Sequence, residues 1–196
     1  KLFLGAPQNY GFPRPDHKLY ESHPIVNALI LYHLGHGDLE VKPDLAHFDG
    51  GHVCFVDGSR AEYDLVLLAT GYKLNYPFIG KEHLNWNGAA PQLYLNAFHP
   101  EYDNLFVLGM IEAAGIGWQG RYEQAELVAR FIHACNNNSP EARRFKQTKR
   151  APPPNLSGGF RYLKLARMAY YVHKDSYLAL LRQHLKRFRK EHSAFK

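Results

Sequence analysis

The sequence predicts an α/β fold, and three patterns along the chain carry this prediction. Two apolar segments, residues 65–69 and 105–108, lack the polar alternation of a half-exposed strand, which is typical of strands buried on both faces. Two hairpin dipeptides, Asp49-Gly50 and Asp57-Gly58, precede the first segment. A stretch with apolar residues at helical spacing follows the second. Strands that alternate with helices in this way indicate a sheet covered by helices.

The N-terminal part of the chain predicts one helix and three strands. Ser22 is a candidate N-cap, Pro24 is tolerated in the first turn, and Gly35 and Gly37 end the helix. The expected apolar face of this helix consists of Ile25, Ala28, Leu29 and Tyr32. The strands are predicted over residues 39–45, 53–56 and 65–69, with the two hairpin dipeptides between them.

The middle of the chain predicts two short strands, a loop and a helix. The strands cover residues 93–95 and 105–108, and the second stops at Gly109. A loop is expected over residues 112–120. A helix then follows because one side of it collects Gln124, Leu127, Val128, Phe131 and Ile132.

Charge divides the chain near residue 140. Residues 141–196 carry 15 Lys and Arg against three Asp and Glu, a net charge of +12, whereas residues 1–140 carry nine basic and 15 acidic residues, a net charge of −6. The segment 136–140 breaks a helical pattern, and a Pro-rich then Gly-rich connector follows. We therefore predict a boundary near residue 140 and a basic tail with helices over residues 162–172 and 176–190, the second capped by Asp175.

The basic tail has two interpretations. One of its basic clusters consists of Arg143, Arg144, Lys146, Lys149 and Arg150. With the tyrosines further along the tail, such a cluster is compatible with binding to nucleic acid or to an anionic membrane. The alternative is a solvated helix pair that packs its aromatic side chains on the acidic body, whose charge is opposite to that of the tail. We favour the second interpretation and predict no nucleic-acid partner, because runs of charge usually face solvent.

Composition excludes several other classes. The longest apolar stretches are far too short to span a bilayer, so no membrane span is expected. Two cysteines, Cys54 and Cys135, are too few for a disulfide framework or a four-cysteine zinc site, which favours a reducing, cytoplasmic compartment. The 12 histidines include no set with the spacing of metal ligands and a partner to complete it, so no metal is predicted.

Two glycines that follow apolar segments mark the candidate binding sites. The sequence contains no G-x-G-x-x-G, G-x-x-x-x-G-K-[ST], H-E-x-x-H or G-x-S-x-G motif. Thr70-Gly71-Tyr72 follows residues 65–69, and Gly109-Met110 follows residues 105–108. Ligands of open α/β sheets bind at the carboxyl ends of strands, and glycine lets the backbone approach a cofactor closely. On pattern alone, a buried strand with a glycine turn is the simpler interpretation of each.

In sequence order the two segments resemble a known family. Residues 62–72 are similar to the A-T-G-[YF] stretch of flavin-containing monooxygenases, which share their build with Baeyer–Villiger monooxygenases. Residues 105–111 resemble that family's last flavin-contacting strand, and residues 122–131 resemble the helix after it. The resemblance covers most of residues 7–135 and includes Glu21 to Asn27.

The resemblance implies the C-terminal part of a fold with two dinucleotide-binding parts, one for FAD and one for NADP. Residues 1–62 would end the NADP part, residues 63–140 would return to the FAD part, and residues 141–196 would form the basic helical tail. Both glycine-rich fingerprints would precede Lys1, so we expect a longer flavoprotein. The cofactor-binding residues implied are Thr70, Gly71 and Tyr72 on the returning connection, Gly109 and Met110 by the phosphate–ribityl region of the flavin, and Gln124 near its isoalloxazine ring.

The family's activity supplies the functional expectation. NADPH reduces FAD, and the reduced flavin takes up O₂ as a peroxyflavin that oxygenates a nitrogen or sulfur nucleophile or a ketone. The partners expected are therefore a small-molecule substrate and O₂, and this chain alone is not expected to be catalytic. Two alternatives stay open: a non-catalytic remnant or interaction module, and another FAD/NAD(P) oxidoreductase. No catalytic residue and no oligomeric state is assigned.

Overall fold

The computed structural model describes residues 5–24, 27 and 29–194, with side chains to residue 190. The chain forms two compact units. Among the described residues, the first unit holds residues 5–18 and 27–71, and the second holds residues 19–24 and 72–194. This division separates compact bodies, and the predicted division into cofactor-binding parts stays a prediction.

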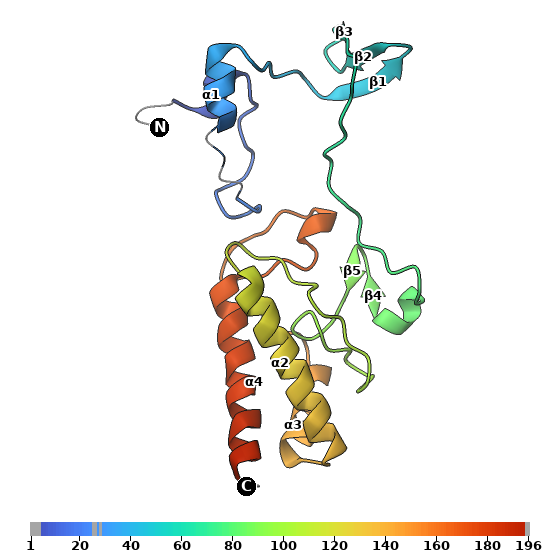
Figure 1. Cartoon of the computed structure of the whole chain (residues 1–196), viewed down its shortest axis with the longest axis vertical. Coiled ribbons are helices and arrows are strands. Elements are labelled where there is room, and N and C mark those ends of the chain that lie inside the picture. The colour runs from blue at the N-terminus through green and yellow to red at the C-terminus, as the bar shows by residue number, and fades with distance from the viewer. Residues whose placement is uncertain (1–4, 25–26, 28, 195–196) are drawn as a thin grey trace. The chain divides into compact units, whose positions relative to one another are not determined.

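The first unit contains a short helix and a three-stranded antiparallel sheet (Figure 1). Its elements are the 3-10 helix η1 (Pro7–Tyr10), the helix α1 (Leu29–His36), and the strands β1 (Leu45–Asp49), β2 (His52–Phe55) and β3 (Arg60–Glu62), in the order β1-β2-β3. Both predicted hairpin turns are confirmed. Gly50 and Gly58 have φ angles of 55° and 84°, which glycine adopts without steric cost.

The predicted strand over residues 39–45 is wrong in position, because β1 begins only at Leu45. Pro43 has no backbone N–H to donate to a ladder, so the chain cannot pair as a regular strand until it has passed this residue. The prediction for residues 53–56 is confirmed by β2 to within one residue. Strand β3 was not predicted, because Arg60-Ala61-Glu62 has no apolar alternation and pairs only through the hairpin.

The helix predicted to begin at Ser22 begins instead at Leu29. Asn27 Oδ1 accepts the Leu29 N–H at 3.0 Å, whereas the Ser22 hydroxyl accepts a hydrogen bond from Arg167. The prediction that glycine ends the helix is confirmed, since Gly37 follows His36 with φ 79°. Of the predicted apolar face, Ile25 and Ala28 lie outside the described residues.

The predicted buried strand over residues 65–69 is not formed. Leu65 and Leu67 expose 82% and 85% of their surface, so the expectation that both faces are covered is wrong here. A strand gains its hydrogen bonds only from neighbouring strands. Within the described residues, the sheets consist of β1-β2-β3 and of β4 (Trp86–Asn87) with β5 (Ala90–Pro91), and none of these strands pairs with residues 65–69.

The predicted strands at residues 93–95 and 105–108 are reduced to isolated bridges. Phe98 pairs with Tyr94 and with Phe106, and the Val107 N–H donates to the carbonyl oxygen of Ala97 at 2.9 Å. Leu95 leaves the extended region with a φ of 51°, which turns the chain back on itself. The burial expected for residues 105–108 is wrong, because none of these four side chains is buried and Leu108 exposes 55% of its surface. Leu93, Tyr94 and Leu95 are buried instead, in a tight turn.

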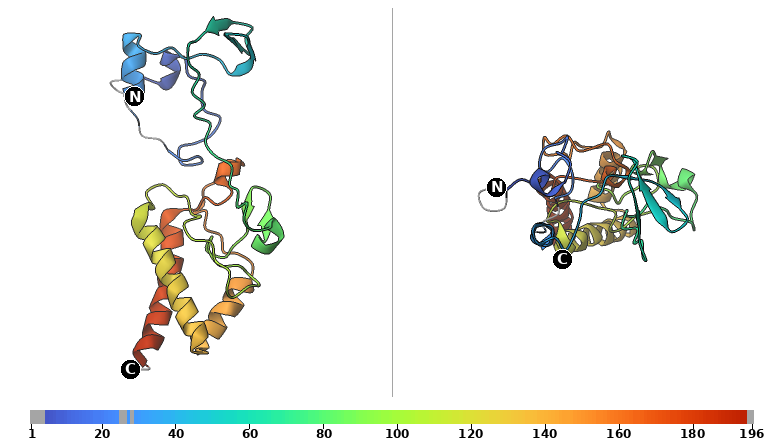
Figure 2. Two further views of the ribbon diagram at one scale, coloured as in Figure 1. Left: turned by 45° about the vertical axis from the view of Figure 1, so that its right-hand side comes forward. Right: turned by 90° about the horizontal axis from the view of Figure 1, so that it is seen from above.

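The second unit is built around three helices. They are α2 (Gly117–Asn136), α3 (Pro140–Arg150) and α4 (Lys174–Ala194), and the unit also holds the 3-10 helices η2 (Lys81–Leu84) and η3 (Ala166–Met168). Helices α2 and α4 run side by side, and α3 packs across one end of the pair (Figures 1 and 2). Their shared core contains Phe98, Leu127, Phe131, Phe145, Tyr177, Leu181 and Leu185. The rings of Phe98 and Phe145 meet edge to face at 4.8 Å.

Helix α2 confirms the helix predicted from apolar spacing, and the helix predicted over residues 176–190 is confirmed by α4. The helix predicted over residues 162–172 is wrong. Its backbone N–H groups bind other segments: Leu163 donates to Glu21 and Val172 donates to Glu112. The predicted cap by Asp175 is also wrong. Asp175 lies inside the first turn, and the Ser176 N–H donates instead to His173 Nδ1 at 3.4 Å.

Helix α3 was not predicted, although its start signal is present in the sequence. Ser139 accepts the Ala142 N–H at 3.0 Å as an N-cap, and Pro140 occupies the first turn, where its missing N–H has no cost. The segment 136–140 thus ends α2 and begins α3. Among the described residues, no helix is both long and apolar enough to cross a membrane.

Candidate functional site

Gly109, one of the predicted cofactor-binding residues, sits in a turn that its conformation makes specific to glycine. Its φ angle is 79°, and its carbonyl oxygen accepts the Ile111 N–H at 2.7 Å. A side-chain methyl at Gly109 would meet no atom within 4 Å. The next residue, Met110, is buried. The turn therefore presents bare backbone to open space on one side and anchors itself in the core on the other.

Gln124 holds this turn from helix α2. Its Oε1 accepts the Gly109 N–H at 2.9 Å, and its Nε2 donates to the carbonyl oxygen of Leu95 at 3.2 Å and to the Tyr177 hydroxyl at 2.9 Å. The side chain is fully buried. Gln124 thus uses both amide protons inside the protein, and its contact with Gly109 is direct. A contact between Gln124 and the flavin ring stays a prediction.

The remaining predicted residues lie apart from this turn in the chain. Thr70 and Gly71 end the first unit, and Tyr72 begins the next stretch of the second. Gly71 has a φ of 82°, as the predicted glycine turn requires, and the Tyr72 side chain is fully exposed. The structure therefore brings together Gly109, Met110 and Gln124, and the role of residues 70–72 stays a prediction.

A cluster of titratable side chains forms around Glu112, just after the turn, and no sequence pattern predicts it. His23 Nδ1 lies 3.2 Å from the Tyr171 hydroxyl and 3.6 Å from Glu112 Oε1. Arg121 lies 3.8 Å from Glu112 Oε2 and donates to the Ile111 carbonyl oxygen at 3.0 Å. Burial raises the pKa of the Tyr171 hydroxyl. These residues come from three distant parts of the chain, around residues 23, 112–121 and 171, and only the fold brings them together.

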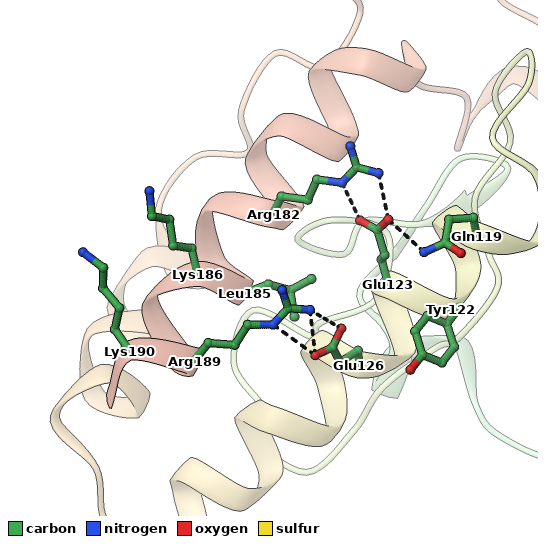
Figure 3. Close-up of a pocket in the computed structure, with 9 residues that line it drawn as sticks. All are labelled: Gln119, Tyr122, Glu123, Glu126, Arg182, Leu185, Lys186, Arg189 and Lys190. Atoms are coloured by element: carbon green, nitrogen blue, oxygen red, sulfur yellow. Dashed lines mark hydrogen bonds and ion pairs between the residues drawn. The ribbon is translucent and has the colours of Figure 1, made fainter. Parts of the chain in front are cut away.

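The seam between α2 and α4 carries two ion pairs at the surface (Figure 3). Arg182 donates twice to Glu123, at 2.7 and 2.8 Å, and Arg189 donates to Glu126 Oε2 at 2.8 Å. The hydrogen bonds from Arg182 lower the pKa of Glu123. A shallow groove of about 670 Å³ lies over this seam, lined by Gln119, Tyr122, Glu123, Glu126, Arg182, Leu185, Lys186, Arg189 and Lys190.

These pairs confirm the prediction that the basic tail packs on the acidic body. Two further pairs do the same at α3, where Lys146 and Lys149 lie 3.0 and 3.1 Å from the carboxylate of Asp103. Within the predicted basic cluster, Arg144 also pairs with Glu141 on its own helix. The cluster is thus divided among separate partners. Among the described residues, no three His, Cys, Asp or Glu side chains are arranged to hold a metal ion.

Comparison with protein families gives one match over most of the chain. Residues 6–175 match the family model described as flavin-binding monooxygenase-like. The match includes the Gly109 turn and Gln124, and it ends within the first turn of α4.

Several curated proteins are similar to the chain. Probable indole-3-pyruvate monooxygenase YUCCA9 of Arabidopsis thaliana is 37% identical over 50% of this chain and 25% of its own length. Flavin-containing monooxygenase 1 of Sus scrofa is 23% identical over 88% of this chain and 33% of its own length. Putative dimethylaniline monooxygenase [N-oxide-forming] 6 of Homo sapiens is 29% identical over 65% of this chain and 24% of its own length. The chain thus spans a quarter to a third of these three relatives, and no solved structure matches it with significance.

Proposed function

This chain belongs to the flavin-binding monooxygenase-like family, and we propose that it is the C-terminal portion of an NADPH- and FAD-dependent monooxygenase. Family membership implies dependence on FAD and NADPH. The observation that carries the assignment to a site is the Gly109 turn. Space is open at the α-carbon of Gly109, and the buried Gln124 side chain holds the Gly109 N–H by a hydrogen bond. The chain is not expected to catalyse the reaction alone.

The residues of the turn fit a bound flavin. Open space at the α-carbon of Gly109 lets a planar or phosphate-bearing group approach the backbone, and any other residue would place a side chain there. In this proposal Gly109 and Met110 line the phosphate–ribityl region, and Thr70 to Tyr72 form the returning connection. When bound, the reduced flavin supplies the chemistry that activates O₂. The chain's own residues orient it and exclude water.

The proposed substrates are small molecules with a nitrogen or sulfur nucleophile or a ketone. The names of two relatives support this range of substrates. One is named as a monooxygenase of indole-3-pyruvate, which carries a keto group, and the other as an N-oxide-forming monooxygenase of dimethylaniline. A reducing, cytoplasmic compartment belongs to the same proposal.

The test is cofactor retention followed by turnover. We expect the 196-residue chain to leave gel filtration without flavin absorbance. The protein expressed from the complete reading frame should retain FAD and oxidise NADPH with O₂ in the presence of an amine, sulfide or ketone. Stoichiometric FAD on the chain alone would contradict the incomplete site. Absence of both FAD and NADPH oxidation from the complete product would favour the alternative, an interaction module built on the core of the second unit.

A further inference from the structure

Three buried groups close a hydrogen-bonded triangle behind the Gly109 turn. Gln124 Nε2 donates to the carbonyl oxygen of Leu95 and to the Tyr177 hydroxyl, and the Tyr177 hydroxyl itself donates to the same carbonyl at 3.0 Å. Gln124 and Tyr177 are both fully buried. Every proton of the Gln124 amide therefore has an acceptor, so the side chain is fixed in one orientation.

The fixed orientation of the Gln124 amide determines which of its atoms faces the Gly109 N–H. With Nε2 committed to the triangle, Oε1 points to the Gly109 N–H, which it accepts at 2.9 Å. A rotation of the amide by half a turn would place donors against the Gly109 N–H and an acceptor against the Leu95 carbonyl, which leaves buried groups unpaired. The Tyr177 hydroxyl enforces the working orientation from helix α4, 53 residues further along the chain.

We propose that Gln124 and Tyr177 are positioning residues for the Gly109–Met110 turn, so that the C-terminal helix α4 sets the geometry of the segment that contacts the flavin. The proposal rests on the proposed function for the identity of the ligand, and on the triangle for the geometry. It gives the basic tail a role at the candidate site that its charge alone does not indicate.

A merely space-filling role for Gln124 makes a different prediction. Methionine has nearly the same length and shape, so Gln124→Met would preserve the packing of a side chain that only fills the core. Glutamate would be the worse replacement in that case, because it brings an ionisable group into a buried site. A positioning role reverses the order, since the protonated carboxyl keeps one acceptor oxygen for the Gly109 N–H and one O–H for the triangle.

Amide hydrogen exchange at Gly109 in the 196-residue chain separates the two cases without any cofactor. The rate is read relative to the amide of Phe131 in the α2 core, so that a global loss of stability cancels. We expect Gln124→Met to raise the relative rate about tenfold, which corresponds to the loss of one hydrogen bond, and Gln124→Glu to restore most of the protection. Equal rates in Gln124→Met and the wild type would overturn the proposal.

Tyr177→Phe tests the contribution of α4 itself. It removes one hydroxyl and keeps the ring, so we expect the relative exchange rate of Gly109 to rise severalfold. The matched control is Tyr94→Phe, because Tyr94 is buried in the same core and its hydroxyl is hydrogen-bonded to His184 Nε2 of helix α4 at 2.8 Å, outside the triangle. A change of similar size in both variants would show a general effect of core tyrosines and overturn the assignment.

The same variants in the flavin-loaded complete protein test the ligand. We expect Gln124→Met and Tyr177→Phe to shift the visible absorption band of the bound flavin and weaken FAD binding about tenfold, with Tyr94→Phe as wild type. If these variants change the hydrogen exchange of Gly109 but do not shift the flavin absorption band, the proposal that the turn contacts the flavin is overturned. If even the wild type binds no flavin, the proposed function fails, while the positioning of the turn is still decided by exchange.

Discussion

The ammonium group of Lys149 lies 3.1 Å from Asp103 Oδ1, at the end of helix α3. Its side chain is fully buried, and it donates to the carbonyl oxygens of His99, Pro100 and Tyr102 at 2.7, 2.8 and 3.1 Å. Burial lowers the pKa of Lys149, while Asp103 opposes this shift. One basic residue of the tail thus fastens the loop that precedes residues 105–108.

Loss of this ammonium group should strongly destabilise the second unit. Lys149→Met keeps the apolar stem but leaves three carbonyl oxygens without their donor and Asp103 without its buried partner. We expect the free energy of unfolding to fall by about 3 kcal/mol, the range for an abandoned buried ionic contact. Urea denaturation followed by circular dichroism measures it.

Lys146→Met is the matched control. Lys146 belongs to the same helix as Lys149 and lies 3.0 Å from the other carboxylate oxygen of Asp103, but its side chain is one-third exposed. A half-solvated pair of this kind contributes less than about 1 kcal/mol. Equal losses in the two variants would contradict the importance that we give to burial.

His184 should make stability depend on pH between about 4 and 6.5. Burial, reinforced by the nearby Arg187, lowers the pKa of His184 from 6.5 to about 4. The unfolded chain therefore takes up this proton at a higher pH than the folded one, and stability present above pH 6.5 is lost as the pH falls towards 4. The loss approaches about 3 kcal/mol at the lower end.

His184→Gln should reduce the slope of the stability profile between pH 4.5 and 6.5, measured as the urea midpoint at each pH. Burial also lowers the pKa of His99, so a smaller slope of the same sign should remain. The carboxylates with lowered pKa values, Asp103, Glu123 and Glu126, lose their contribution only at lower pH, so they do not mask the effect. The exposed His83→Gln serves as the control. A slope unchanged by His184→Gln would show that another group titrates.

The ion pair of Glu123 with Arg182 should couple α2 to α4. The carboxylate is nearly buried and accepts two hydrogen bonds from the guanidinium, a geometry stronger than that of a typical surface pair. We expect Glu123→Gln to reduce the free energy of unfolding by about 1 kcal/mol. A double-mutant cycle with Arg182→Met measures the coupling, and a coupling of zero would mean that the pair is incidental.

Local patterns predicted the parts of the fold that depend on local physics. The glycine turns at Gly50 and Gly58 and the periodic helix α2 are confirmed because backbone sterics and apolar spacing act within a few residues. The strand predicted over residues 65–69 is not formed, because a run of leucine and valine favours burial but does not provide the neighbouring strands that a sheet requires. Residues 162–172 failed because distant carbonyl groups, such as that of Glu112, compete for their N–H groups.

The candidate site divides in the same way. Gly109 could be found from the sequence, because a glycine after an apolar run marks a place where the backbone must turn or be approached. The partners of Gln124 could not, since Leu95 and Tyr177 meet it only after α2 and α4 have packed together. Lys149 was grouped with a surface cluster, because charge patterning does not reveal which lysine is buried.

A methyl group at Gly109 should separate the cost of backbone strain from the loss of a binding surface. Gly109 and Gly88 have φ angles of 79° and 66°, and a side-chain carbon at either meets no atom within 4 Å. Gly109→Ala and Gly88→Ala should therefore each cost about 1 kcal/mol of stability through strain alone. Only Gly109→Ala fills the space through which we propose that the flavin approaches.

The measurement is FAD binding by the complete protein, followed by flavin fluorescence, together with urea denaturation of each variant. We expect Gly88→Ala to bind FAD as the wild type does, and Gly109→Ala to bind it at least about tenfold more weakly, because one methyl group in a close contact displaces the ligand by more than its packing tolerates. Gly158→Ala would be a poor control, since its methyl group would overlap the His173 ring. Equal FAD affinity in Gly109→Ala and Gly88→Ala would place the flavin elsewhere and leave the Gly109 turn a purely structural feature.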